Sequence, residues 1–273
     1  MEDVPEEDRI YAFLKFSEKP YIEELYNDGK MHFSLLSSFN TKEMGTLQGD
    51  PNESLSEIYP AKGDFKVIIG GVDISSSIVG SPIISGYDDS ENNFIWCSYG
   101  IFEKQYGSLK NNEKLDFSKM KELGNYCIIV LNFKEFNKRL EDAFYLEFSK
   151  NILKNWINKT FITGGAVEYV PNDYTGYFGP FKKYLDYEIQ NEYRYVLNRI
   201  IGVPNCVECT NDKKLVQIDD EIYLAINRDF YDMYLGNLSD ISVIVPVDEV
   251  NDALIMYFSE GKSISEIQKK YPI

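Results

Sequence analysis

The chain has 273 residues, of which 44% are hydrophobic and 15% aromatic, and its 28 basic and 44 acidic residues give a formal net charge of −16. This is the composition of a globular protein with a sizeable core, and it excludes a largely disordered chain. The acidic balance argues against nucleic-acid binding, because phosphate contacts need a basic face.

The N-terminal ten residues lack the basic and apolar regions of a signal peptide, and no apolar run approaches the roughly 18 residues of a membrane span. Of the four cysteines, Cys97 and Cys127 lie in apolar stretches typical of core strands. Disulfides are therefore not expected. The sequence predicts a cytoplasmic protein with no membrane partner.

Short strands and short helices alternate along the chain, after an acidic N-terminus (1–8) that is expected to be loose. The predicted strands are apolar or alternating stretches: 11–16, 31–36, 93–102, 125–133, 166–170, 214–218, 221–226 and 241–247. Further short strands or a hairpin are expected within 65–88. The predicted helices have apolar residues at helical spacing or clear end signals: 19–28 closed by Gly29, 117–124, 134–150, and two pieces either side of Gly261.

A polar, turn-rich stretch at 37–62 is expected to be a long functional or mobile loop. No repeat, low-complexity tract or linker divides the chain. We therefore expect residues 1–273 to form a single α+β domain, with a mixed or mostly antiparallel sheet and short flanking helices.

The stretch 178–197, FGPFKKYLDYEIQNEYRYVL, is the best candidate for a site. Its second half alternates, and side chains on a strand point to opposite faces in turn. This pattern predicts a strand with one charged and amide-bearing face, made of Glu188, Gln190, Glu192 and Arg194. The opposite face is largely aromatic. A helix that leads into a strand is the alternative for the stretch as a whole.

Gln190 and Glu192 suit one particular chemistry, the cleavage of an N-ribosyl bond such as that of NAD. Cleavage passes through an oxocarbenium-like state, which a carboxylate beside the ribose stabilises. The Gln190 amide would orient an acceptor. The alternative is an edge strand whose polar face is only solvated, with Glu192 paired to Arg194 or to a lysine.

Other motifs have weaker cases. His32 is the only histidine, and nothing near it resembles a nucleophile elbow. The pair Cys206 and Cys209 cannot complete a tetrahedral zinc site, so no metal is expected.

The order of several short motifs resembles that of a family of uncharacterised bacterial proteins. That family begins with strand, helix and strand, continues with an acidic Gly-Asp-x-x-Glu loop and an IxCxY-like strand, and has a late Gly-Pro-Phe-x-Lys … Gln-x-Glu-Tyr/Phe-Arg signature. The matching segments are short, and together they span about residues 10–197, which is most of the chain: 11–40, 49–53, 95–99, 179–183 and 190–194.

This layout is similar to an ADP-ribosyltransferase fold, with a strand–helix–strand opening and a late strand bearing Q/E-x-E. The resemblance implies an NAD-using ADP-ribosyltransferase or NAD glycohydrolase, serving as a toxin or phage-defence effector. Glu192 would be catalytic, Gln190 would face the acceptor, and NAD would be the substrate. The residues expected to contact NAD are Tyr11, Lys15, Ser34, Ser98, Lys182 and Arg194.

The chain departs from such transferases at two points. Its first strand has Tyr11 and Lys15 where a transferase offers Arg or His, although Arg9 lies just before it. The strand that would carry Ser-Thr-Ser has only Ser98.

Two other functions stay open. One is a non-enzymatic regulatory or defence module that binds a small anionic ligand, such as a nucleotide, or a protein partner, through Lys182, Lys183 and Arg194. The other is a magnesium-dependent nuclease or hydrolase using the carboxylates Asp50, Glu53, Glu188 and Glu192.

Overall fold

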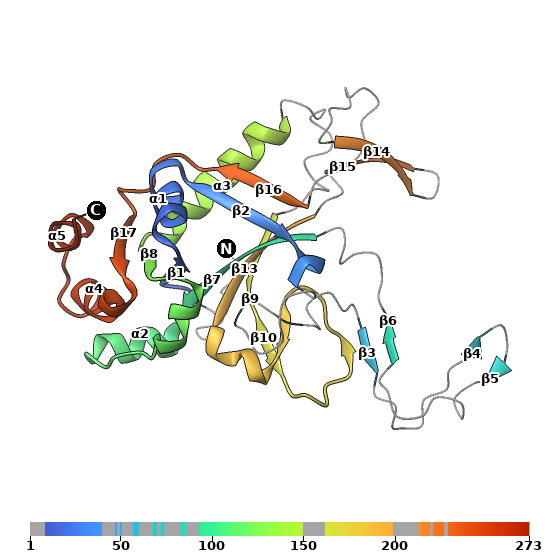
Figure 1. The fold of residues 1–273 in the computed structure, drawn as a ribbon, viewed down its shortest axis with the longest axis horizontal. Helices are drawn as coiled ribbons and strands as arrows, with labels where there is room; N and C mark the ends of the chain where they lie inside the picture. The colour runs from blue at the N-terminus through green and yellow to red at the C-terminus, as the bar shows by residue number, and fades with distance from the viewer. Residues whose placement is uncertain are drawn as a thin grey trace.

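The computed structural model shows an α+β protein with a mostly antiparallel sheet, as the sequence predicts (Figure 1). The structure describes residues 9–39, 47, 50, 57–59, 68–69, 72–73, 83–85, 93–149, 162–198, 213–218, 221–226 and 229–272. The acidic N-terminus (1–8) and the Cys206–Cys209 pair lie outside these residues.

Eight antiparallel strands form the main sheet. They are β1 (Ala12–Ser17), β2 (Lys30–Leu35), β7 (Asn93–Ile101), β8 (Tyr126–Val130), β9 (Ile162–Ala166), β13 (Glu192–Asn198), β16 (Phe230–Tyr234) and β17 (Ser242–Pro246). One row runs β16-β2-β7-β1-β8-β17, and β13 joins β7 to β9.

The described residues also form four smaller sheets. β10 (Glu168–Val170) and β12 (Lys182–Tyr184) are parallel. The antiparallel groups are β3 (Glu57–Tyr59) with β6 (Ile83–Ser85) and β11 (Gly176–Tyr177), β4 (Ile68–Ile69) with β5 (Val72–Asp73), and β14 (Lys213–Ile218) with β15 (Glu221–Ile226).

The α-helices are α1 (Lys19–Asp28), α2 (Glu103–Lys110), α3 (Phe133–Ser149), α4 (Val250–Phe258) and α5 (Ile264–Lys270). Short 3-10 helices are η2 (Leu36–Phe39), η5 (Ser118–Leu123), η6 (Leu185–Gln190) and η7 (Val247–Glu249). In the described part of the chain, no helix is both long and apolar enough to cross a membrane.

The two faces of the main sheet carry separate cores, because successive strand residues point to opposite sides. On β1, Phe13 packs in the core that includes α1 and α3, where Ile22 and Phe136 are buried. Its neighbour Leu14 packs in the core that includes α2, α4 and α5, where Leu254 is buried. Helices therefore cover both faces of the sheet (Figure 1).

The main sheet forks at β7, and the fork positions the candidate site. On one edge, β7 pairs with β13 from Asn93 to Tyr99. On the other edge β2 pairs near its start, with Ser34 opposite Ile95, and β1 pairs near its end, with Leu14 opposite Tyr99. Residues 96–98 lie between these two pairings, so the sheet is open there.

The strand–helix–strand opening is confirmed. β1, α1 and β2 match the predicted segments within a residue or two, and Gly29 ends α1 in the left-handed conformation at φ 64°. β7, β8, α3, β17 and the two C-terminal helices around Gly261 also fall where predicted. The predicted helix at 117–124 is the 3-10 helix η5.

Within 178–197 the prediction of a single strand with four polar residues on one face is wrong, and the alternative of a helix that leads into a strand is closer to the structure. β12 is followed by the 3-10 helix η6, and β13 begins only at Glu192. Asn191, between η6 and β13, is left-handed at φ 41°, which breaks any strand there. Glu188 is exposed on η6, so the four polar residues do not share one strand face.

Other elements also differ from expectation, among them β9 and β11, which lie where no strand was predicted. The predicted loop 37–62 contains most of η2 and the strand β3. α2 was not predicted, because only Leu109 of its residues is buried and its sequence has no apolar face. β16 was not predicted either; only Tyr231 and Met233 of its five residues are buried.

Candidate functional site

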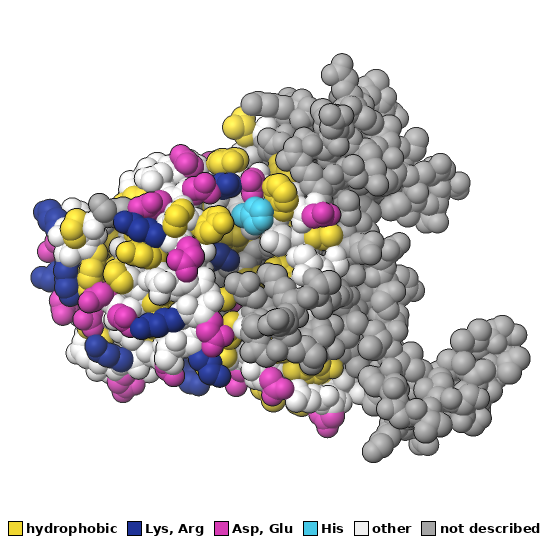
Figure 2. Space-filling model, viewed as in Figure 1, with side chains coloured by type: hydrophobic (Ala, Val, Ile, Leu, Met, Phe, Trp, Pro, Cys, Tyr) yellow, Lys and Arg dark blue, Asp and Glu magenta, His cyan; other side chains and the backbone are white. Residues whose placement is uncertain are grey.

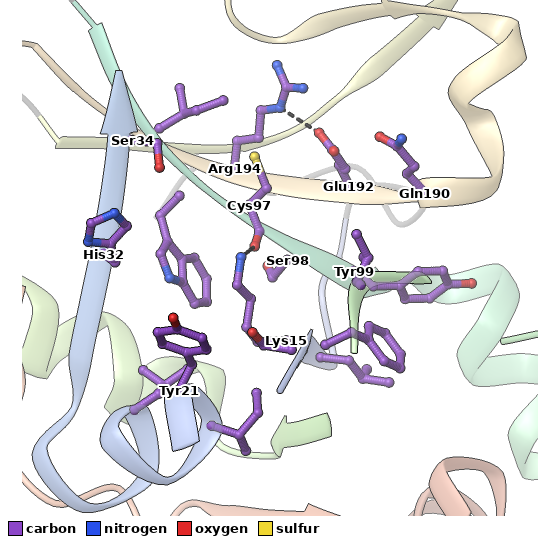
Figure 3. Close-up of a pocket in the computed structure, with 18 of the residues that line it drawn as sticks. Lys15, Tyr21, His32, Ser34, Cys97, Ser98, Tyr99, Gln190, Glu192 and Arg194 are labelled. Atoms are coloured by element: carbon purple, nitrogen blue, oxygen red, sulfur yellow. Dashed lines mark hydrogen bonds and ion pairs between the residues drawn. The ribbon is translucent and has the colours of Figure 1, made fainter. Parts of the chain in front are cut away.

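A cavity of about 730 Å³ opens at the fork of the sheet (Figure 3). Its floor is the part of β7 between the two pairings, residues 96–98, and its walls come from β1, β2, α1, β13 and η6. Glu192 and Gln190 lie on one side of it, and His32 and Ser34 on the other. A volume of this size accommodates a ligand of nucleotide dimensions.

Glu192 is a buried carboxylate held by two cations. Its Oε2 accepts a hydrogen bond from Arg194 Nε at 2.6 Å, and its Oε1 accepts one from Lys183 Nζ at 3.0 Å. The Arg194 side chain is fully buried and also donates to the Pro180 carbonyl at 2.5 Å. Since β13 lies between β7 and β9, the alternative of a solvated edge strand is wrong, although the expected pairing of Glu192 with Arg194 and a lysine is present.

These contacts keep Glu192 ionised. Burial by itself would raise the pKa of Glu192, but the charges of Arg194 and Lys183 and their hydrogen bonds outweigh burial and hold this pKa well below its usual range. Glu192 is therefore ionised at neutral pH, in direct contact with the positive charges of Arg194 and Lys183.

Gln190 reaches the same cluster from η6 rather than from the strand. Its Oε1 accepts a hydrogen bond from Lys183 Nζ at 2.7 Å, and its Nε2 donates to the Leu47 carbonyl at 2.9 Å. The left-handed turn at Asn191 brings Gln190 and Glu192 onto one lysine. Lys183 itself is buried on β12, so three separate elements meet at this point.

Lys15 lies beside residues 96–98 of β7, where the sheet is open between the pairings with β2 and β1. Its Nζ donates to the Cys97 carbonyl at 2.7 Å and lies 5.1 Å from the centre of the Trp96 ring. This carbonyl faces the edge of β7 that neither β1 nor β2 covers. The ammonium thus takes the place of a strand partner and brings a positive charge to the cavity.

Two serines, Ser34 and Ser98, and one thiol, Cys97, also line the cavity. The Ser98 hydroxyl donates to the Tyr193 carbonyl at 3.1 Å. Burial, followed by the nearby Glu192 charge, raises the pKa of the Cys97 thiol to about 11. Cys97 is therefore a neutral thiol and not a nucleophile at neutral pH.

Two of the predicted NAD-contacting residues lie outside the cavity lining. The Tyr11 hydroxyl donates to Glu103, and the Tyr11 ring stacks on Tyr106 with the ring centres 4.0 Å apart. Lys182 forms an ion pair with Glu168 and lies over the Tyr174 ring. By contrast Lys15, Ser34, Ser98 and Arg194 all line the cavity together with Gln190 and Glu192.

A second hollow of about 960 Å³ borders Glu192 from the side of α2 and η6. Asn191 and Tyr169 line it, and the Tyr169 hydroxyl accepts a hydrogen bond from the Glu192 backbone N–H at 2.8 Å. Glu192 therefore lies between two spaces, and a ligand in either would be near it.

Sequence reasoning missed the outer part of the first cavity. His32 and Asp232, paired at 2.6 Å, line it with Tyr21 and Phe230. The alternation of β2 places His32 and Ser34 on one face, but Asp232 and Phe230 arrive from β16, about 200 residues later in the chain. No local signal links the two strands.

Metal-binding residues do not gather in the described residues: no group of three or more His, Cys, Asp or Glu side chains is placed to hold an ion. Of the carboxylates considered for magnesium, Asp50 is buried and Glu188 is exposed, while Glu53 lies outside the described residues.

No protein-family model, no curated protein and no solved structure matches this chain.

Proposed function

We propose that this protein cleaves the N-ribosyl bond of NAD, as an ADP-ribosyltransferase or an NAD glycohydrolase. The observation that carries the proposal is the ionised, buried Glu192 in the wall of a cavity large enough for a nucleotide. In the reaction, the bond between C1′ of the ribose and the nicotinamide nitrogen breaks, and nicotinamide leaves as a neutral base. An acceptor or water then bonds to C1′ and releases its proton.

The role of Glu192 is electrostatic. Positive charge develops on C1′ and the ring oxygen as nicotinamide leaves, and a fixed carboxylate in a water-poor site stabilises it. Arg194 and Lys183 keep Glu192 ionised and hold it in one position through both carboxylate oxygens. Preorganisation of this kind reduces the rearrangement that the transition state requires.

The arrangement of three strands supports the same proposal. The first strand, the strand with Ser98 and the strand with Glu192 are distant in sequence, yet β1, β7 and β13 are neighbours in the sheet. Lys15, Ser98 and Glu192 thus line one cavity. Lys15 would stand in for the arginine or histidine of a transferase, and its positive charge would attract the diphosphate of NAD.

Gln190 would act on the acceptor side. Its amide oxygen is anchored by Lys183, and its backbone lies beside the turn that borders the second hollow. The protein would work in a reducing cytoplasm as a toxin or phage-defence effector, where Cys97 and Cys127 stay free thiols, as they are in the structure.

Labelled NAD tests the proposal. The protein is incubated with NAD labelled in the adenylate half, with and without a cell lysate, and both nicotinamide release and label transfer to protein are followed. Release without transfer identifies a glycohydrolase, and transfer identifies a transferase. If the wild-type protein does neither, the proposal fails.

A second function, a non-enzymatic module that binds an anionic ligand or a partner, is favoured by one specific observation. Both carboxylate oxygens of Glu192 are engaged by cations, so the carboxylate also serves to fix Lys183 and Arg194. Lys182, which pairs with Glu168, would not belong to such a site. Tight binding of ADP-ribose without any nicotinamide release from NAD would favour this module.

A further inference from the structure

The outer end of the cavity carries three exposed aromatic rings. Tyr21 on α1 is 66% exposed and Phe230 on β16 is 42% exposed, and the His32 side chain on β2 is 54% exposed. All three line the cavity. In Figure 2 the single histidine, in cyan, lies on the surface among apolar side chains. We call Tyr21, His32 and Phe230 the aromatic rim.

Packing does not account for the exposed rings of this rim. The buried face of α1 is supplied by Ile22, Leu25 and Tyr26, and Tyr21 points away from it. β16 buries Tyr231 and Met233, while Phe230 belongs to its exposed residues. Exposed aromatic rings gathered at one cavity mouth are typical of a ligand-binding surface.

His32 is the member of the rim that an ion pair or hydrogen bond holds. His32 Nδ1 lies 2.6 Å from Asp232 Oδ1, and its ring centre is 5.0 Å from that of Phe230 with the planes tilted by 31°. Lys30 bonds Glu24 at 3.0 Å and lies 3.8 Å from Asp232. The rim is thus a set of flat surfaces bordered by carboxylates that accept hydrogen bonds.

The rim and Glu192 lie on opposite sides of one cavity. Figure 3 shows His32 on β2 at one side and Glu192 on β13 at the other, with Lys15 and Cys97 between them. A ligand that touches both ends must be extended, and one with a flat ring at one end and a ribose at the other fits this layout.

We propose that the aromatic rim is a nucleobase subsite that takes the adenine of an adenine nucleotide. The identity of the base rests on the proposed function, because adenine is the ring at the far end of NAD from the bond that breaks. The base stacks on the rim, as bases do on aromatic side chains. The carboxylates of Asp232 and Glu24 accept hydrogen bonds from the adenine amino group or the adjoining ribose hydroxyls.

Binding experiments without turnover test the subsite. The probes are AMP, ribose 5-phosphate, which lacks the base, and nicotinamide mononucleotide, which lacks the adenylate half. Affinity is measured by calorimetry for the wild type, Tyr21→Ala and Phe230→Ala. The matched control is Tyr145→Ala, which removes an exposed aromatic ring from α3 away from the cavity. Thermal unfolding checks that each variant is folded.

The subsite predicts that AMP binds the wild type more tightly than ribose 5-phosphate does. Each rim variant should weaken AMP binding by roughly 5- to 150-fold, the range that base stacking supports. Nicotinamide mononucleotide binding should not change, and Tyr145→Ala should bind AMP as the wild type does.

Equal AMP affinity in the wild type and both folded rim variants would overturn the subsite, as would equal binding of AMP and ribose 5-phosphate. These outcomes are separable from failure of the proposed function. If the protein releases no nicotinamide but the rim variants bind AMP more weakly as predicted, the subsite is supported and the proposed function fails. If it releases nicotinamide and the rim variants keep the wild-type KM for NAD, the subsite is wrong and the proposed function stands.

Discussion

Arg194 and Glu192 are two residues apart on β13 and point to the same side, where Arg194 Nε donates to Glu192 Oε2 at 2.6 Å. The arginine side chain is fully buried and the glutamate side chain is 11% exposed. Removing one partner of such a pair leaves the other as a poorly compensated buried charge.

Arg194→Met is expected to destabilise the fold by roughly 3–5 kcal/mol, the usual cost of breaking a buried ion pair from one side. The measurement is urea unfolding. Lys138→Met is the control, because Lys138 also pairs with a carboxylate, Asp142, but both side chains are about two-thirds exposed, where loss of the pair costs about 1 kcal/mol or less. Equal losses of unfolding free energy in the two variants would contradict the expectation that the buried Arg194 pair matters more than a surface pair.

Acid should remove the contribution of Glu192 to stability. Its pKa is lowered from 4.5 to about 2 in the folded protein, chiefly because the Arg194 and Lys183 charges outweigh the effect of burial. A carboxyl with a depressed folded pKa stabilises the fold above its unfolded pKa, and this stability is lost as the pH falls through the folded value. The stability contributed by Glu192 is therefore lost as the pH falls from 4.5 to about 2.

Urea unfolding of the wild type and Glu192→Gln at several pH values measures this contribution. Above pH 4.5 the free energy of unfolding of the wild type should exceed that of Glu192→Gln by a constant amount. This difference should shrink as the pH falls further. A difference that grows as the pH falls would show that Glu192 is protonated in the folded protein.

The Cys97 thiol should resist alkylation in the native protein. Burial and then the Glu192 charge raise its pKa to about 11, so the reactive thiolate is scarce at neutral pH. Iodoacetamide treatment followed by peptide mass spectrometry should find the Cys97 peptide unmodified in buffer and modified in urea. Rapid labelling in buffer would mean that the cavity floor is more open than the structure shows.

Two glycines should respond to alanine in opposite directions. Gly29 ends α1 at φ 64°, and a Cβ there would lie 2.4 Å from the Gly236 carbonyl oxygen. Gly29→Ala should cost roughly 2–3 kcal/mol through strain and this contact. Gly107 lies within α2, where a Cβ would meet no atom of the described residues within 4 Å. Gly107→Ala should therefore stabilise the fold by about 0.5–1 kcal/mol.

Thermal and urea unfolding of the two variants check the prediction. If Gly29→Ala were neutral, the turn that leads from α1 into β2 would have to tolerate a shift of the backbone around Gly236.

Local signals explain which parts of the fold could be predicted from the sequence. Pro20 and Gly29 mark the two ends of α1, and the alternation of β1 and the apolar run of β7 are visible in the chain. Residues 185–191 resemble a strand in the sequence because polar and apolar residues alternate there, but 185–190 form the 3-10 helix η6. Asn191, a residue that tolerates the left-handed conformation, was the one local sign of a break.

The site could be predicted only in part, because long-range pairing decides which side chains reach it. Gln190 and Glu192 were found from their spacing, yet they meet through Lys183 rather than by sharing a strand face. Nothing local distinguishes Lys183 from Lys182. The pairing of β12 with β10 buries Lys183 and leaves Lys182 beside Glu168.

The rate of nicotinamide release from NAD tests the central claim most directly. The wild type is compared with Glu192→Gln and with Glu141→Gln, which makes the same change at an exposed position of α3. Circular dichroism confirms that each protein is folded. Loss of the Glu192 charge should slow release by on the order of a hundredfold or more, whereas Glu141→Gln should match the wild type. No release by the wild type, or equal release by folded Glu192→Gln, would contradict the claim that Glu192 stabilises the cleavage of an N-ribosyl bond.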